Sequence, residues 1–106
     1  MASFNDIETI KSIAERFALL LKDEMNIDSV YLYGSAVNGG STKDSDIDIA
    51  VISNDFTGDR VEDIFKLMKI RRKVDNRIEP HPFRGSEFDC SNPFVKEILT
   101  KGIKIM

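Results

Sequence analysis

The sequence has very little cysteine and no excess of positive charge. Cys90 is the only cysteine, so an internal disulfide and a zinc site built from several thiolates are both excluded. The formal net charge of −3 leaves the chain without the basic patch that nucleic-acid-binding proteins use to neutralise phosphates. We therefore expect no nucleic-acid binding by this chain alone.

Long hydrophobic runs are also absent. The longest one lies near residues 17–21, whereas a membrane-spanning helix needs about 20 apolar residues. The first residues show no secretory signal pattern. These absences predict a soluble, cytoplasmic protein without a membrane segment. A length of 106 residues with 42% hydrophobic content predicts a single domain, residues 1–106, with one core.

The most informative stretch is residues 33–52, which joins a small-residue turn to paired carboxylates. A β-branched and aromatic run at residues 30–33 predicts a strand that stops at Gly34. From Asp46 onward, apolar residues alternate with others over a length that predicts a second strand. Residues two apart on a strand project from the same face, so we expect Asp46 and Asp48 to lie side by side.

Paired carboxylates need compensation for their mutual repulsion. At about 5 Å and an effective dielectric constant near 20, two carboxylates repel by about 3 to 4 kcal/mol. Water, a raised pKa or, best of all, a divalent cation offsets this repulsion, and the apolar residues around the pair favour the cation. An EF-hand calcium loop starting at Asp44 is excluded, because the required Gly and Glu positions hold Ile49 and Asp55.

One motif combines a Gly-Ser turn, a loop with glycine and an acidic strand: Gly34-Ser35, then Gly39, then Ser45-Asp46-Ile47-Asp48. This motif resembles the signature of the DNA polymerase beta-type nucleotidyltransferases, and in particular their small stand-alone members, the minimal nucleotidyltransferases. The resemblance covers the Gly-Ser pair, the spacing to the two aspartates and the hydrophobic strand that follows. The chain departs from the pattern at Asn38, where relatives often carry Arg or Lys.

The resemblance implies a catalytic and metal-binding set of three carboxylates. Asp46 and Asp48 would hold two Mg²⁺ ions, with Mn²⁺ as an alternative, and Glu79 would bind one of these ions as the third carboxylate. One ion activates an incoming hydroxyl, and the other holds the triphosphate and stabilises the departing pyrophosphate. Asp75 is the competing candidate for the third position, and we favour Glu79.

The nucleotide-binding residues implied by the resemblance are Gly34, Ser35 and Ser45. Residues 35–37 are expected to form the first turn of a short helix, which would direct backbone N–H groups at a phosphate. No Lys-Ser or Lys-Thr pair follows a glycine-rich loop, so this site is not a P-loop.

The fold class predicted is α/β or α+β: a small mixed sheet of about four strands backed by helices on one face, with the acidic site on the open face. Apolar spacing predicts helices over residues 6–24, 59–73 and 93–101, and strands over 30–33, 46–52 and 74–80. Pro80 and Pro82 place the end of the last strand at a sheet edge or outside the sheet. His81 is interpreted as a surface histidine or, less favoured, a substrate-side base. Residues 103–106 form a terminal strand or a packed tail.

The resemblance also implies an activity, transfer of AMP from ATP, or of another nucleoside monophosphate from its triphosphate, to a hydroxyl acceptor. Similar minimal nucleotidyltransferases often pair with a HEPN-domain protein and act as antitoxins by adenylylating a tyrosine of that toxin. A HEPN-domain partner is therefore expected, and an oligomer is compatible with the sequence. Two alternatives stay open: a non-catalytic module that neutralises a partner by contact, and a transferase acting on a small-molecule hydroxyl.

Overall fold

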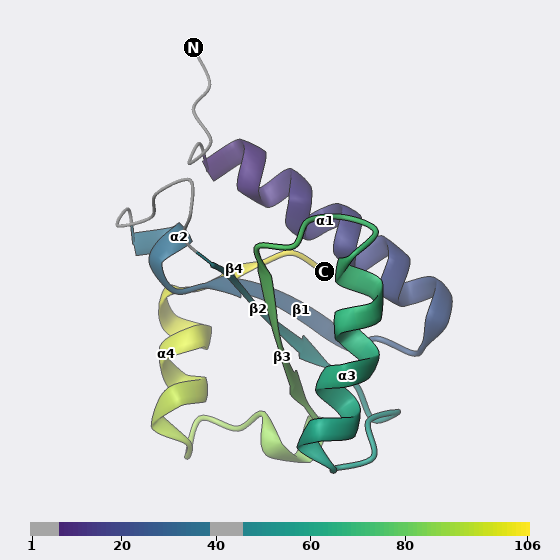
Figure 1. Ribbon diagram of the computed structural model, residues 1–106. Coiled ribbons are helices and arrows are strands. Elements are labelled where there is room, and N and C mark those ends of the chain that lie inside the picture. The colour runs from purple at the N-terminus through teal and green to yellow at the C-terminus, as the bar shows by residue number, and fades with distance from the viewer. Residues whose placement is uncertain (1–6, 39–45) are drawn as a thin grey trace.

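The computed structural model describes residues 7–38 and 46–106 of the chain. The elements within these residues are α1 (Ile7–Glu24), β1 (Ser29–Tyr33), α2 (Ser35–Asn38), β2 (Ile47–Ile52), α3 (Arg60–Arg71), β3 (Ile78–Phe83), the 3-10 turn η1 (Gly85–Glu87), α4 (Pro93–Lys101) and β4 (Ile103–Lys104). The strands form one sheet in the order β3-β2-β1-β4 (Figure 1). Only β2 and β3 run parallel, so the predicted mixed α+β fold is confirmed.

The larger hydrophobic core lies between one face of the sheet and the helices α1 and α3. Every second residue of β2 points into this core, because successive side chains on a strand alternate between the two faces. The core includes the fully buried residues Phe17 and Leu21 of α1, Leu67 of α3, and Ile49 and Val51 of β2.

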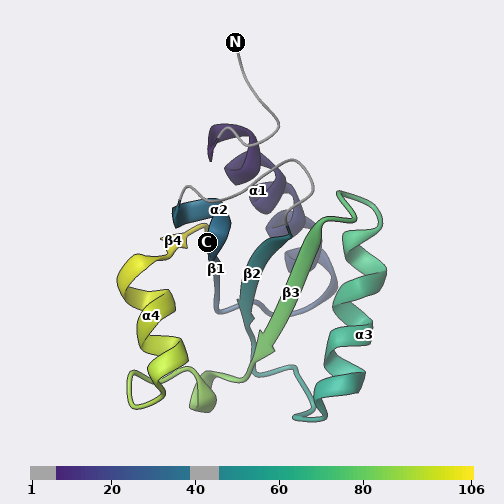
Figure 2. The ribbon, with the colours of Figure 1, turned by 60° about the vertical axis from the view of Figure 1, so that its left-hand side comes forward.

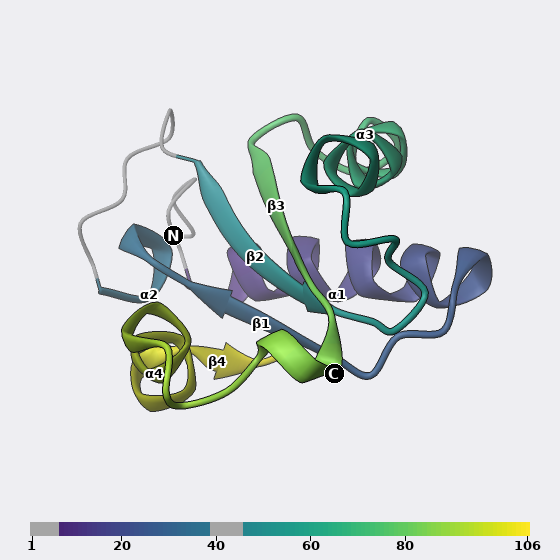
Figure 3. The same cartoon turned by 90° about the horizontal axis from the view of Figure 1, so that it is seen from below.

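A second, smaller core lies on the opposite face of the sheet, under α4. Val95 and Ile98 of α4 are buried there against Ala50 and Ile52 of β2. Figures 2 and 3 show the strands running between α3 and α4. The prediction of helices on one face only is therefore wrong, because α4 has its own apolar stripe and buries it on the second face.

The edge strand β3 contains two prolines and continues past both. The strand predicted over residues 74–80 lies further along the chain. The chain first turns after α3, and β3 then runs from Ile78 to Phe83. The Ser53 N–H donates to the Phe83 carbonyl at 2.9 Å, so the backbone N–H and C=O groups of the odd-numbered residues of β3 point toward β2. Pro80 and Pro82 alternate with these residues, so their backbone nitrogens point away from β2, where a missing N–H breaks no hydrogen bond between the two strands.

The helix ends agree with the caps that the sequence offers. The Asp59 side chain accepts hydrogen bonds from the first turn of α3, and Asn92 accepts one from Phe94 N–H, at 2.9 Å, at the start of α4. The predicted cap of α1, Asn5, lies outside the described residues. At the other end of the chain, β4 pairs antiparallel with β1, so the alternative of a terminal strand is confirmed. None of the helices in the described ranges has the length and apolarity to span a bilayer.

Candidate active site

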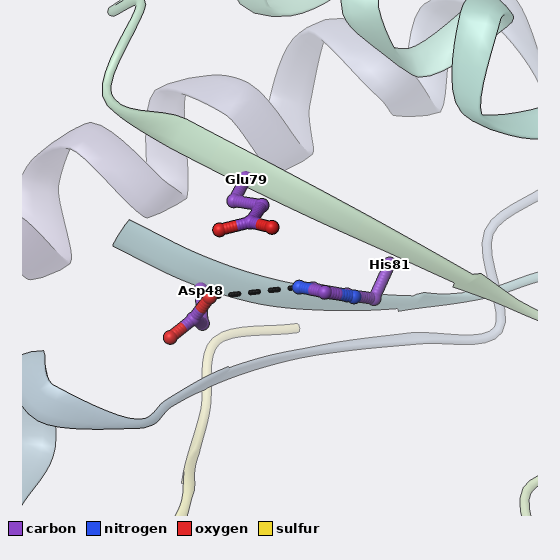
Figure 4. A group of neighbouring side chains, drawn as sticks. All are labelled: Asp48, Glu79 and His81. Carbon is purple, nitrogen blue, oxygen red and sulfur yellow. Dashed lines mark ion pairs between the residues drawn. The ribbon is translucent and has the colours of Figure 1, made fainter. Parts of the chain in front are cut away.

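Three ionisable side chains meet on the face of the sheet that α4 partly covers. Asp48 of β2 and Glu79 of β3 are register partners across the parallel pair, and His81 follows on the same face. Each of the three offers one ligand atom, and these atoms all lie within 4.8 Å of one another. The His81 Nε2 atom is 3.5 Å from Asp48 Oδ1. Figure 4 shows Glu79 and His81 projecting from β3 toward Asp48.

A third carboxylate, Asp46, contacts Glu79 but does not belong to the group of three residues whose ligand atoms lie within 4.8 Å of one another. Asp46 lies two residues before Asp48, immediately ahead of β2, and is exposed. The pKa of Glu79 is raised above its ordinary value of 4.5, first by a side-chain hydrogen bond with Asp46, which needs a shared proton, then by burial and by the charge of Asp48. His81 opposes this rise. The three carboxylates therefore form one negatively charged cluster in which Glu79 binds its proton more tightly than usual.

The glycine turn lies directly against this cluster. Tyr33, the last residue of β1, pairs with Asp48, and the chain then turns at Gly34 with φ of +81°. A Cβ atom on Gly34 would collide with the Asp48 carboxylate, and few residues other than glycine adopt this φ. Ser35 follows at the start of α2, and Val37 N–H donates to the Gly34 carbonyl at 3.1 Å. The Gly34 turn and Asp48, which belong to one stretch of the sequence, are therefore in contact in the fold.

Sequence reasoning missed Tyr33 and misjudged His81. The Tyr33 hydroxyl is buried without a hydrogen-bond partner among the residues described, and its pKa is raised first by burial and then by the charges of Asp48 and Glu79. The His81 ring is 5.7 Å from the Tyr33 ring, and its side chain is only 18% exposed, so the interpretation of a surface histidine is wrong. The period of two along β3 was the available signal, because it puts His81 on the face of Glu79.

Asp75, the competitor for the third carboxylate, is engaged elsewhere. It precedes β3 and forms an ion pair with Arg77 at 3.0 Å. The side-chain hydrogen bond from Arg77 holds the pKa of Asp75 below its ordinary value. Glu79 is therefore the carboxylate that the sheet register brings to the aspartates, and Asp75 is not in the group that meets there. Ser45, expected to bind nucleotide, lies outside the described residues.

A trough of about 370 Å³ opens beside the carboxylates, between α3 and β3. Its α3 wall is one stripe of the helix, formed by Arg60, Ile64, Met68 and Arg71, and its other lining residues are Asp46, Glu79, Pro80 and His81. The trough therefore combines apolar walls with cations from α3 and carboxylates from the sheet.

The raised pKa of Glu79 predicts a pH-dependent stability. Because the folded state binds this proton more tightly than the unfolded chain, ionisation of Glu79 destabilises the fold, and the favourable contribution is lost as the pH rises through the raised pKa. In metal-free buffer at neutral pH, Glu79→Gln should melt at a higher temperature than wild type. This difference should shrink as the pH falls through the raised pKa, because wild-type Glu79 then becomes protonated. A difference that stays constant or grows on acidification in thermal melts would contradict the raised pKa.

The site places carboxylates on neighbouring strands beside a glycine turn, and the mixed sheet is covered by helices. The sequence resemblance to nucleotidyltransferases implies this arrangement. The family model described as Polymerase beta, Nucleotidyltransferase matches residues 15–106, and the chain belongs to this family. A comparison with curated proteins found no significant match.

Two solved structures share this fold. A protein from Sulfolobus solfataricus, described as a proposed nucleotidyltransferase, superimposes with a TM-score of 0.67 at 16% identity, over 98% of this chain and 87% of that one. A chain from a crystal structure described as a toxin-antitoxin with AMP-PNP superimposes with a TM-score of 0.63 at 23% identity, over 87% of this chain and 72% of that one.

Proposed function

We propose that this nucleotidyltransferase is metal-dependent and transfers AMP from ATP to a hydroxyl acceptor, a tyrosine of a HEPN-domain toxin. The observation that carries the proposal is the register pairing of Asp48 with Glu79, with the Gly34 turn packed against Asp48. This pairing provides carboxylates where the reacting phosphate would lie and a side-chain-free turn for the rest of the triphosphate. Membership of the family and the likeness to a toxin-antitoxin structure with AMP-PNP support it.

Each residue of the site has a distinct part in the proposed reaction. The backbone of Gly34 and the hydroxyl of Ser35 bind the triphosphate, and Ser45 adds a further contact to it. The acceptor oxygen forms a bond to the α-phosphorus, while the bond from that phosphorus to the pyrophosphate oxygen breaks. The hydroxyl proton passes to an Oε atom of Glu79, the carboxylate that the sheet register places beside Asp48.

The carboxylate cluster fits a divalent cation. Asp46, Asp48 and Glu79 supply the oxygen ligands that Mg²⁺ and Mn²⁺ prefer, and the pKa of Glu79 is raised by its hydrogen bond with Asp46, by burial and by the charge of Asp48. When bound there, Mg²⁺ would neutralise charge on the triphosphate and lower the pKa of the attacking hydroxyl. His81 faces Asp48 and would keep that carboxylate oriented.

The first test of this site is stabilisation by its ligands. Mg²⁺ or Mn²⁺ with ATP should stabilise wild type by about 1 to 3 kcal/mol at concentrations about ten to a hundred times Kd, measured by thermal unfolding. Asp48→Asn should lose most of this stabilisation, yet melt no lower than wild type without ligands, because the substitution relieves repulsion between carboxylates. A melting temperature of wild type that ignores metal and ATP would contradict the metal site.

The acceptor distinguishes the proposal from its rivals. If the acceptor is a tyrosine of a toxin, a labelled AMP unit from ATP should appear on the partner protein. A transferase for a small-molecule hydroxyl would leave the partner unlabelled, and a contact-only module would label nothing. Incubation with ATP labelled at the α-phosphate, Mg²⁺ and a HEPN-domain partner, followed by separation of the proteins, therefore distinguishes the proposal from both rivals.

A further inference from the structure

The trough between α3 and β3 is not used by the nucleotide in the proposed reaction. The turn proposed to bind the triphosphate packs against Asp48 from the β1 side, because Gly34 follows the residue that pairs with Asp48 across β1 and β2. Glu79 lies on the other side of Asp48, on β3. Acceptor and leaving group lie roughly in line across the reacting phosphorus. An acceptor opposite the triphosphate therefore approaches from β3, where the trough opens beside Asp46 and Glu79.

The walls of the trough suit an apolar body that carries the hydroxyl. Ile64 and Met68 of α3 and Pro80 of β3 supply aliphatic surface and a thioether, and both side chains of α3 are only partly buried. Methionine sulfur makes favourable contacts with aromatic rings. The carboxylate of Glu79 lines the same trough and can accept a hydrogen bond from the hydroxyl of a ring packed against this surface. A phenol-type acceptor satisfies both features.

The two arginines of the trough differ in what holds them. Arg71 Nη1 donates to the carbonyls of Asn76 and Ile78, at 3.0 and 2.8 Å, and so ties α3 to the start of β3. Arg60 is exposed and makes no hydrogen bond or ion pair with any residue in the described ranges.

The position of Arg60 is also unfavourable for α3 itself. Arg60 is the first residue of the helix, directly after the cap Asp59. The N-terminal end of a helix carries partial positive charge, so a cation there is destabilising and an anion is stabilising. Arg60 lines the trough together with Glu79, so its guanidinium is available to a negatively charged group on a molecule bound there.

We propose that the trough binds the acceptor and that Arg60 selects acceptors with a carboxylate close to a phenol-type hydroxyl. This inference rests on the proposed function for its direction of approach. The same chemistry is offered by a tyrosine flanked by acidic residues in a protein and by a small hydroxyphenyl acid.

A binding experiment tests the trough without any need for transfer. In two-dimensional NMR with saturating Mg²⁺, 4-hydroxyphenylacetate should shift the amides of α3 and of residues 78–81. The neutral isostere 4-hydroxyphenylacetamide should bind at least fivefold more weakly to wild type. Arg60→Gln should abolish this preference for the acid and should not lower the melting temperature. The matched control Lys66→Gln removes a charge from an exposed position of α3 outside the trough, and should keep the preference.

A peptide separates the two sources of the acceptor. If an acetylated Glu-Tyr-Glu amide binds the trough more tightly than the free acid, the acceptor belongs to a protein chain, and equal or weaker binding assigns it to a small molecule.

Shifts elsewhere in the protein, equal affinity for acid and amide, or an Arg60→Gln protein that keeps the preference would overturn the inference. So would ATP shifts centred on the trough. AMP transfer without ligand binding in the trough would overturn this inference alone, whereas binding there without any AMP transfer would overturn the proposed function alone.

Discussion

Glu79→Gln is expected to slow transfer by about two to four orders of magnitude while ATP affinity stays within a few fold. Glutamine keeps the size of the side chain but can neither carry the charge nor take the proton of the acceptor hydroxyl. The lost interaction acts mainly in the transition state, so the loss appears in the rate of the chemical step rather than in binding. Single-turnover transfer at saturating ATP measures the rate, and calorimetric titration measures the affinity.

Asp75→Asn is the matched control for this substitution. It also converts a carboxylate near β3 into an amide, but Asp75 is paired with Arg77 rather than with the aspartates. We expect wild-type transfer, with a loss of stability of up to about 1 kcal/mol from the weakened ion pair. Wild-type rates in Glu79→Gln together with a collapse in Asp75→Asn would reassign the third carboxylate to Asp75.

The parts of the site that the sequence predicts are those fixed by local geometry. The period of two from Asp46 onward predicts that Asp46 and Asp48 project to the same side, although β2 itself begins at Ile47 and includes only Asp48. The stop of β1 at Gly34 follows from the same local reading, since glycine readily adopts the positive φ found there. The strand for Glu79 was also predictable as a segment, although its bounds were shifted.

Long-range pairing decides the features that the sequence does not predict. Nothing local shows that β3 runs parallel beside β2, yet this register alone sets Glu79 against Asp48 and brings His81 close to both. In the same way, an amphipathic α4 predicts burial of Val95 without saying which face of the sheet will bury it. The trough depends on α3 lying beside β3, so Arg60 had no visible connection to the site.

Chemistry and partner contact depend on different residues in this fold, and the final prediction uses this separation. Asp46→Asn with Asp48→Asn should leave the protein folded, because Asp46 is exposed, Asp48 is half-buried, and neither belongs to the hydrophobic cores. The double mutant should fail to add AMP to a HEPN-domain partner and fail to silence it, whereas wild type should increase the mass of the partner by whole AMP units. Intact-mass spectrometry and the ribonuclease activity of the partner are the two measurements.

Two comparisons make this result decisive. Asp23→Asn with Glu24→Gln removes the same amount of negative charge from exposed positions on α1, and should transfer AMP as wild type does. If the Asp46 and Asp48 double mutant silences the partner as well as wild type, and no mass is added, the protein acts by contact and the enzymatic proposal is wrong. We expect the mass increase, because clustered carboxylates that raise the pKa of Glu79 destabilise the folded protein at neutral pH, and contact with a partner gives no reason to retain them.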